Sequence, residues 1–409
     1  MTKRTGMVAA LDLGTAKTCV VVGAVSEHGI EVCGLGEAPS RGLRKGVIVH
    51  VQSTVQAIRK AVEEAEAMAG CEIRHVTASI GGGHIRGLSS HGVVAVRNGE
   101  VSAGDLNRVL DAARAVAVPA DREVLHVLPQ EYIIDDQEGL KEPIGIAGVR
   151  LEAKVHVVTS QVSAAQNLVK CCKQAGLVVD DVVLGALASA DAVLTPEEKD
   201  LGVALVDVGA GTTDVVIFHA GAVRHTASLP LGGQHLTNDI AAGLRTPTAE
   251  AEKIKQRFGC ARAAVVERHV EIEVPSVGNR DPRVLSRHIL CEIIEPRVEE
   301  IFMLVQHEIQ KCGMEEHLAS GCVITGGSTL LAGMAEMAEE VLGMPVRRGL
   351  PRGIGGLVDV VKSPQYATAV GLVLYGARQH ASGPYFRIRE ENVYRKVRHR
   401  MAKWLGEVF

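Results

Sequence analysis

The sequence predicts an α/β protein made of two related halves. Its 44 glycines against only eleven aromatic residues favour a design with many tight turns. Short β-branched runs that end in glycine-rich turns alternate with helical patterns along the chain, which is typical of α/β units. At roughly 100–200 residues per domain, a chain of 409 residues is expected to hold two or three structural units.

The individual elements follow from these patterns in chain order. We expect strands at 7–12, 18–24, 76–80, 203–208, 214–218 and 322–325. We expect helices at 53–69, 163–175, 235–243, 249–258, 291–311 and 330–342.

The stretch from about residue 84 to residue 160 differs in texture from its surroundings, and we interpret it as an inserted subdomain. A hairpin-like run at 92–96 comes first, a single helix follows, and 119–150 is punctuated by proline and glycine. Ser102, with Asp105 three residues later, is a helix start signal. The apolar positions of this helix fall on one face, namely Leu106, Val109, Leu110 and Ala113.

A short motif near the start of the chain recurs 195 residues later. Residues 10–15 read ALDLGT and residues 205–214 read LVDVGAGTTD, so an apolar strand ends in aspartate before a glycine turn with hydroxyl residues. Each copy alone is compatible with an ordinary β-turn, because Asp-x-Gly is common in turns. Two copies half a chain apart favour a shared role.

That role is phosphate and metal binding. Amides of a glycine turn can approach phosphate oxygens because no Cβ intervenes, threonine hydroxyls add donors, and a strand-end aspartate can hold Mg²⁺ directly or through water. Two such turns would clamp a magnesium nucleotide between them. The candidate phosphate residues are Asp12, Gly14, Thr15, Asp207, Gly209, Gly211, Thr212 and Thr213, and the candidate metal residues are Asp12, Asp207 and Asp214.

Lys17 follows the first turn and could reach a phosphate as a point charge, or it could be an exposed hairpin lysine. The familiar nucleotide motifs are excluded. The sequence has no GxxxxGK[ST], and Asp214 stands where the last glycine of GxGxxG belongs.

Composition excludes several other classes. Nine cysteines are scattered without CxxC spacing, which is typical of core residues in a reducing compartment. No apolar run approaches the roughly 18–20 residues of a membrane-spanning helix, and we expect no export signal. Sixteen histidines show no HExxH pattern, and we interpret His126 and His156 as core or sheet-face residues rather than metal ligands.

The motifs resemble those of the actin, heat-shock-70 and sugar-kinase superfamily. Residues 321–329 look like its adenosine motif, with Gly326, Gly327 and Ser328 at the turn. Residues 251–255 are similar to the helix from which a glutamate and a lysine, here Glu252 and Lys255, reach the ribose and base, although a solvated amphipathic face is the other interpretation. Residues 366–376 resemble the second connecting helix. The resemblance implies ATP and Mg²⁺ as cofactors and an α/β, actin-like fold of two ribonuclease-H-like halves around a nucleotide cleft.

Within the superfamily the resemblance narrows to the FtsA family of bacterial cell-division proteins. The segment 121–152 looks like the FtsA-type subdomain 1C, which replaces the usual actin subdomain 1B. Segments 231–241 and 345–351 are also FtsA-like. The family implies an ATP-binding, self-associating, filament-forming protein. It would tie the tubulin-like division protein FtsZ to the cytoplasmic face of the bacterial inner membrane at the division site, as a peripheral protein.

The resemblance also implies a division of the chain. We expect domain 1A at 1–83 and 163–202, subdomain 1C at 84–162, domain 2A at 203–234 and 311–380, subdomain 2B at 235–310, a linker at 381–393 and a membrane-targeting helix at 394–409.

The tail itself indicates a membrane-surface helix. Residues 387–409 carry seven Lys or Arg against three Glu, a net charge of +4, which leaves −8 on the rest. The apolar stripe is Val397, Met401, Trp404, Leu405 and Val408, and the cations Arg395, Lys396, Arg398, Arg400 and Lys403 take other faces. A C-terminal helix docked on the core is the structural alternative.

Enzymatic activity and partners follow less directly. On the first connecting helix, 185–194, Asp191 is the only carboxylate, so it is a weak candidate for the catalytic base and we expect slow hydrolysis at most. By resemblance, 235–310 receives the acidic C-terminal peptide of FtsZ, and 84–162 contacts later division proteins. The cations of 235–310 are no better candidates than other surface residues: Arg280, Arg283, Arg287 and Arg297. A metabolic kinase and a pilus-assembly or peptide-binding actin relative are the alternatives, and nucleic acid is not an expected partner.

Overall fold

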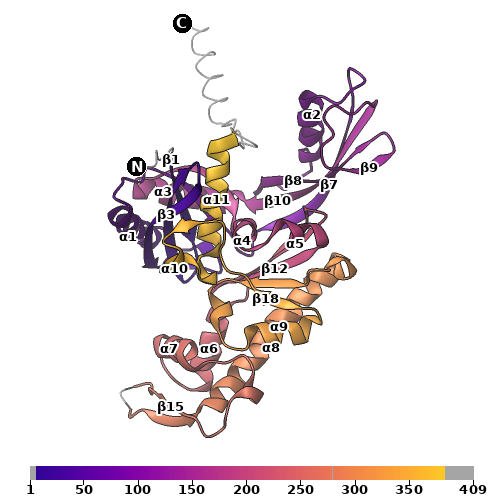
Figure 1. Ribbon diagram of the computed structural model, residues 1–409. Coiled ribbons are helices and arrows are strands. Elements are labelled where there is room, and N and C mark those ends of the chain that lie inside the picture. Colours follow the sequence, from indigo (N-terminus) through magenta and orange to yellow (C-terminus); the bar gives the residue numbers. More distant parts are fainter. Residues whose placement is uncertain (1–5, 279, 383–409) are drawn as a thin grey trace. The chain divides into compact units, whose positions relative to one another are not determined.

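Two sheets with the same strand pattern form the frame of the protein (Figure 1). The structure is a computed structural model that describes residues 6–278 and 280–382, and the relationships below all lie within residues 6–377. The first sheet has the order β11-β6-β1-β2-β3-β19. Its strands are β1 (Gly6–Leu13), β2 (Lys17–Ser26), β3 (Gly29–Pro39), β6 (His75–Ile80), β11 (Val178–Leu184) and β19 (Gly355–Gly356).

The second sheet repeats this pattern in the order β14-β13-β12-β17-β18. In each sheet three consecutive antiparallel strands are followed by two strands that pair in parallel beyond the first. The strands are β12 (Val203–Val208), β13 (Thr213–His219), β14 (Ala222–Leu229), β17 (Cys322–Thr325) and β18 (Val346–Arg348). The internal repeat of the sequence is therefore a repeat of architecture, as the expected two ribonuclease-H-like halves require.

The side chains of strand β12 alternate between two separate apolar cores. Val203 and Leu205 belong to the core shared with the first half, whereas Ala204 and Val206 belong to the core beneath the helices of the second half. Successive side chains of a strand point to opposite faces, so one strand supplies both cores.

The helices of the two halves cover these sheets. In the first half and its connections they are α1 (Val51–Ala69), α3 (Val162–Ala175), α4 (Gly185–Val193), α5 (Pro196–Leu201), α10 (Val358–Val361) and α11 (Ala367–Ser382). In the second half they are α6 (Gly233–Gly243), α7 (Thr248–Phe258), α8 (Arg287–Lys311) and α9 (Met334–Leu342). Short 3₁₀ turns lie at Ala263–Val265, Glu315–His317, Gly327–Leu330 and Pro364–Tyr366.

The predicted start of the helix at 330–342 was wrong. Residues Gly327–Leu330 form a 3₁₀ turn instead, and α9 begins only at Met334. Gly333 before it has a φ of 77°, in the left-handed region that separates the two segments.

An inserted sheet with its own core lies between β6 and α3 of the chain. Its order is β7-β10-β8-β9, and α2 packs on it around Val109 and Leu151. The helix begins at the predicted capping box, because Ser102 and Asp105 exchange side-chain-to-backbone hydrogen bonds. The elements are β7 (Arg86–Ala95), α2 (Ala103–Arg114), β8 (Arg122–Ile134), β9 (Gln137–Leu140) and β10 (Arg150–Gln161).

The predicted local hairpin at 92–96 was wrong. These residues end strand β7, whose partner is β10, more than 50 residues along the chain, and the segment 119–150 supplies β8 and β9. Two further hairpins complete the described residues: β4 (Leu43–Arg44) with β5 (Val47–Ile48), and β15 (Glu271–Val274) with β16 (Arg283–Ser286).

Candidate functional site

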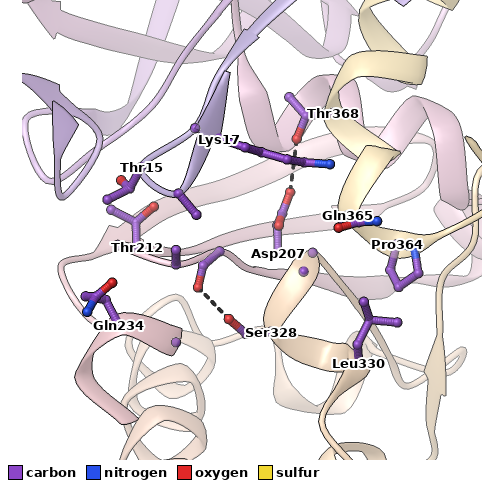
Figure 2. A pocket seen from close by; sticks show the side chains of 18 of the residues that line it. Thr15, Lys17, Asp207, Thr212, Gln234, Ser328, Leu330, Pro364, Gln365 and Thr368 are labelled. Atoms are coloured by element: carbon purple, nitrogen blue, oxygen red, sulfur yellow. Dashed lines mark hydrogen bonds between the residues drawn. The ribbon is translucent and has the colours of Figure 1, made fainter. Parts of the chain in front are cut away.

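A cleft of about 1090 Å³ brings both copies of the repeated motif together. Figure 2 shows Thr15 and Thr212 near each other, with Ser328 beside them and Leu330 and Pro364 farther along the cleft. The cleft is lined by residues of both halves, from Asp12 to Thr368. Thirteen predicted residues line it: Asp12, Gly14, Thr15, Lys17, Asp207, Gly209, Gly211, Thr212, Glu252, Lys255, Gly326, Gly327 and Ser328, together with the predicted metal residue Asp214.

The second glycine turn is held rigidly by its own backbone. The Gly209 amide donates to the Thr212 carbonyl at 2.9 Å and closes the turn between β12 and β13. The Gly209 carbonyl accepts from the Gly233 amide at 3.0 Å and from the Ser328 hydroxyl at 2.8 Å. The turn is thereby fixed to the start of α6 and to the adenosine-like motif.

The two glycine turns also touch each other. A Cβ placed on Gly211 would collide with the Thr15 hydroxyl and lie 3.0 Å from the Lys45 Cα. Only glycine allows the second turn to approach the first this closely.

Each strand-end aspartate is held by a hydroxyl group from another element. Ser79 of β6 donates to the Asp12 carboxylate at 2.7 Å. Ser189 of α4 donates to Asp207 at 2.6 Å, and Thr368 of α11 approaches the same oxygen at 3.4 Å (Figure 2). Because α4 and α11 connect the halves, Asp207 lies where the two halves join.

These carboxylates are hard to ionise in the absence of a cation. Burial raises the pKa of Asp207 to about 7, and the nearby carboxylates of Asp214 and Asp12 add to the rise, against the opposing Ser189 hydrogen bond. Burial raises the pKa of Asp214 to about 6 and also raises the pKa of Asp12. A cation beside them would offset both the desolvation and the mutual repulsion.

The residues fit a magnesium ion that is shared with other ligands. Within the described part of the chain the Asp214 Oδ1 atom is buried and meets no partner at hydrogen-bond geometry, although the Ser228 hydroxyl lies close enough to lower the Asp214 pKa; a bound cation or its water would supply a partner. The described residues contain no group of three or more His, Cys, Asp or Glu side chains that could hold a metal by themselves. Mg²⁺ usually keeps several waters and takes further ligands from substrate phosphates, so Asp12, Asp207 and Asp214 would hold it mainly through water.

A polar network ties α7 to α6 at the other end of the cleft. The Lys255 ammonium donates to the Glu252 carboxylate at 2.7 Å, to the Thr237 hydroxyl at 2.8 Å and to the Gly233 carbonyl at 2.9 Å. Thr237 in turn hydrogen-bonds Glu252. Both predicted residues thus line the cleft with their positions fixed, rather than forming a solvated face.

Two expectations are corrected by the geometry. Thr213 does not line the cleft, because its side chain is fully buried and donates to the Leu231 carbonyl at 2.9 Å. Asp191 is not among the residues that line the cleft and is paired with Lys199 at 2.8 Å, so it is not positioned as a base. Thr212 lies in the turn and lines the cleft, whereas Thr213 is the first residue of β13, which explains why the two neighbours differ.

Lys17 lines the cleft, but its charge is already compensated. Its ammonium is paired with Glu37 and lies 3.7 Å from the centre of the Tyr366 ring. It is therefore neither the exposed hairpin lysine nor a free cation aimed at a phosphate.

The cations suggested for the 235–310 segment are largely engaged within the fold. Arg283 donates to the Leu244 carbonyl, and Arg287 donates to the Phe258 carbonyl at 2.7 Å and lines the cleft. Arg297 forms ion pairs with Asp239 and Glu300. They are poor candidates for contacts with an acidic peptide.

Sequence reasoning missed the hydroxyl groups of Ser79, Ser189 and Thr368. Ser79 and Ser189 carried no signal, since a serine in a strand or helix pattern indicates nothing about an aspartate more than ten residues away. Thr368 lies in the segment identified as the second connecting helix. The tail residues 394–409 and residues 383–393 of the predicted linker lie outside the described residues, whereas the first two residues of the predicted linker, Ala381 and Ser382, belong to α11. No described helix is long and apolar enough to cross a membrane.

Comparisons with known proteins agree in sequence and in fold. Residues 204–371 match the family described as "Cell division protein FtsA", and residues 82–159 match "SHS2 domain inserted in FTSA". The chain is 54% identical to the cell division protein FtsA of Pseudomonas aeruginosa over 92% of this chain and 91% of that one. It is 41% identical to the Escherichia coli K12 protein over 98% and 96%, and 37% identical to the Bacillus subtilis protein over 90% and 83%.

Among solved structures, the chain resembles one from a PilM–PilN type IV pilus biogenesis complex, with a TM-score of 0.65 and 17% identity over 92% of this chain and 99% of that one. It also resembles MreB5 of Spiroplasma citri bound to ADP, with a TM-score of 0.55 and 13% identity over 93% and 100%. At these identities the likeness concerns the fold alone, and it is an actin-like fold.

Proposed function

The chain belongs to the FtsA family of bacterial cell-division proteins, and we propose that it is an ATP-binding, self-associating protein that attaches FtsZ to the cytoplasmic membrane. Its place would be the inner face of that membrane at the division site, as a peripheral protein. The observation that carries the nucleotide part is the convergence of the two repeated glycine turns on one cleft with three buried carboxylates.

The cleft divides into two chemical regions. The turns at Gly14–Thr15 and Gly209–Thr212 offer backbone amides and hydroxyls to phosphates, and the carboxylates beside them suit Mg²⁺. The Lys255–Glu252 network and the Gly326–Ser328 turn offer polar groups to a nucleoside. The MreB5 structure with ADP supports a nucleotide in such a fold.

The arrangement favours binding with slow hydrolysis. The carboxylates that line the cleft are Asp12, Asp207, Asp214 and Glu252. The first three would stay ionised beside a dication and cannot accept a proton readily. Glu252 is occupied by Lys255 and Thr237 at the nucleoside end. Among the described residues that line the cleft, no carboxylate is left to activate water.

Membrane attachment is proposed from the sequence of 394–409. Each cation near an anionic surface contributes about 1 kcal/mol, and a single amphipathic helix of this kind binds only reversibly. A row of linked subunits raises the effective concentration of every further tail, so avidity can exceed the single-helix affinity by about 10²–10⁴. Nucleotide-dependent self-association and attachment would reinforce each other.

Two partner surfaces complete the proposal. We assign the C-terminal peptide of FtsZ to subdomain 2B, about 235–310, and later division proteins to the inserted subdomain 84–162. The pilus-assembly alternative gains no weight from the PilM–PilN likeness, because 17% identity concerns the fold alone.

The test is co-sedimentation with anionic liposomes, with and without Mg-ATP. The full chain is compared with a version that ends at Gly383 and with a version whose last sixteen residues are scrambled at constant composition. The scrambled tail keeps the charge and removes the apolar stripe. We expect only the chain with the intact tail to sediment with the liposomes, and a larger fraction of it to do so with Mg-ATP. Equal pelleting of all three versions, or of none, would overturn the attachment mechanism.

A further inference from the structure

Four turns from distant parts of the chain meet at one end of the cleft. Two of them are the repeated glycine turns, at Gly14–Thr15 and Gly209–Thr212. The others are the β4–β5 turn at Lys45–Gly46 and the Gly81–Gly82 turn after β6. The Gly46 amide donates to the Thr15 hydroxyl at 3.1 Å, and a Cβ on Gly46 would lie 2.7 Å from the Gly82 Cα. The β4–β5 turn is thus packed against all three of the others, since Gly211 lies against the Lys45 Cα.

The Lys45–Gly46 turn holds a lysine in an unfavourable backbone conformation. Lys45 has a φ of 51° and Gly46 a φ of 76°. Two positive φ values are what a two-residue hairpin connection of type I′ requires, and asparagine or glycine is the usual first residue. A lysine there costs backbone energy, and such strain clusters at ligand sites.

The cations around the cleft are distributed unevenly. Lys255 and Arg287 are bound to groups at the nucleoside end, where Arg257 also lines the cleft, 5.0 Å from the centre of the Phe258 ring. Lys17, the lysine nearest to the first turn in sequence, is compensated by Glu37 and by the Tyr366 ring. Lys45 is not itself among the lining residues, but it precedes the lining residue Gly46, is exposed, and has no ion-pair partner among the residues that the structure describes.

We infer that Lys45 supplies the positive charge that faces the terminal phosphate of a bound nucleoside triphosphate, the role that the sequence suggested for Lys17. This inference rests on the proposed nucleotide binding. Its side chain starts from a Cα in contact with the Gly211 turn, and its ammonium is a mobile point charge on a flexible stem. The Gly46 amide meanwhile accounts for one lone pair of the Thr15 hydroxyl, so that the hydroxyl proton remains available to a phosphate oxygen.

The consequence is selectivity for the triphosphate. A nucleoside diphosphate lacks the group that Lys45 would meet, so the charge favours ATP over ADP. The same contact would make the β4–β5 turn responsive to ATP hydrolysis, because loss of the terminal phosphate leaves the strained turn without its ligand.

The experiment compares the affinities of the full chain for Mg-ATP and Mg-ADP, measured by calorimetry at two salt concentrations. We expect Lys45→Met to weaken the binding of Mg-ATP about tenfold and that of Mg-ADP less than twofold. Both affinities of Lys45→Arg should stay close to those of the unaltered chain. Arg44→Met, at the exposed neighbouring residue, is the matched control and should change neither affinity. Lys45→Gly separates charge from strain, because it should raise the thermal midpoint and still lose the preference for ATP.

Two results would overturn the inference, and they are distinguishable. If the unaltered chain prefers ATP and Lys45→Met keeps the same ratio of affinities, Lys45 has no such role while nucleotide binding stands. If the unaltered chain binds neither nucleotide, the proposed function fails and the inference fails with it.

Discussion

The Ser189 hydroxyl donates a hydrogen bond of 2.6 Å to the Asp207 carboxylate. Ser189 belongs to helix α4 and Asp207 is the penultimate residue of strand β12, so the bond joins a connecting helix to the second half of the fold. Because this bond favours the ionised carboxylate, it opposes the rise of the Asp207 pKa that burial causes. Ser189 would therefore prepare Asp207 for the proposed cation.

Ser189→Ala should weaken Mg-ATP binding by about fivefold, which corresponds to about 1 kcal/mol for one hydrogen bond to a carboxylate. The pH at which Mg-ATP affinity reaches half its maximum should also move upward, an effect that simple loss of packing would not produce. Ser90→Ala is the control, since Ser90 makes a comparable bond of 2.7 Å to the Ala113 carbonyl in the inserted subdomain. Equal losses of affinity in both variants would contradict the prediction.

Asp207→Asn should change how stability depends on pH in the metal-free protein. The folded-state pKa is about 7 and the ordinary value is 3.8, so between these values the folded state holds a proton that the unfolded state has released. This contribution is present in full below about pH 4 and is lost as the pH rises through 7. The variant lacks this dependence. Its free energy of unfolding relative to the original should therefore increase by about 1 kcal/mol per pH unit within the window.

Denaturant titrations at pH 5, 6, 7 and 8 measure that difference. A constant difference across the series would show that Asp207 ionises normally. With Mg-ATP present at pH 8, the original chain should be more stable than Asp207→Asn. The ionised Asp207 and Asp214 then neutralise a bound cation, which an asparagine at 207 cannot do.

Lys255→Met should reduce ATP affinity by tenfold or more and lower the thermal midpoint. The variant loses three hydrogen bonds and leaves Glu252 in a partly buried position without its counter-charge. Lys253→Met on the same helix removes only an exposed ion pair with Glu250 and should change neither quantity measurably. Thermal scans and nucleotide titrations of the two variants, side by side, test the assignment. If they behave alike, α7 is a solvated face after all.

Lys17→Met should destabilise the protein and leave nucleotide preference unaltered. The half-buried Glu37 loses its ion pair and the Tyr366 ring loses its cation, which together are expected to cost about 1–2 kcal/mol. The ratio of ATP to ADP affinity should remain that of the original chain. A selective loss of ATP binding would return the phosphate role to Lys17. Glu37→Gln is the companion variant and should lower the thermal midpoint to a similar extent.

Much of this protein could be predicted from local pattern. The strands that carry Asp12 and Asp207 next to their last residues are apolar runs followed by glycine turns. These two features are local, so they identify the strand and the turn and predict phosphate chemistry. The capping box of Ser102 and Asp105 is equally local and places the start of α2 correctly. The family resemblance rests on the same contiguous segments, and the comparisons confirm it.

Other features depended on which segments meet in space. Whether Lys17 or Lys45 is left with a free charge depends on Glu37 and Tyr366, which lie 20 and 349 positions from Lys17. Asp191 was the only carboxylate on its helix, yet the direction of that helix turns it toward Lys199. The hydroxyl that holds Asp207 comes from a helix whose sequence gives no sign of it. The sequence by itself determined the elements and the chemistry at their ends, because both follow from neighbouring residues. Only the tertiary structure decided which charges are compensated, because burial and pairing are properties of contacts between distant segments.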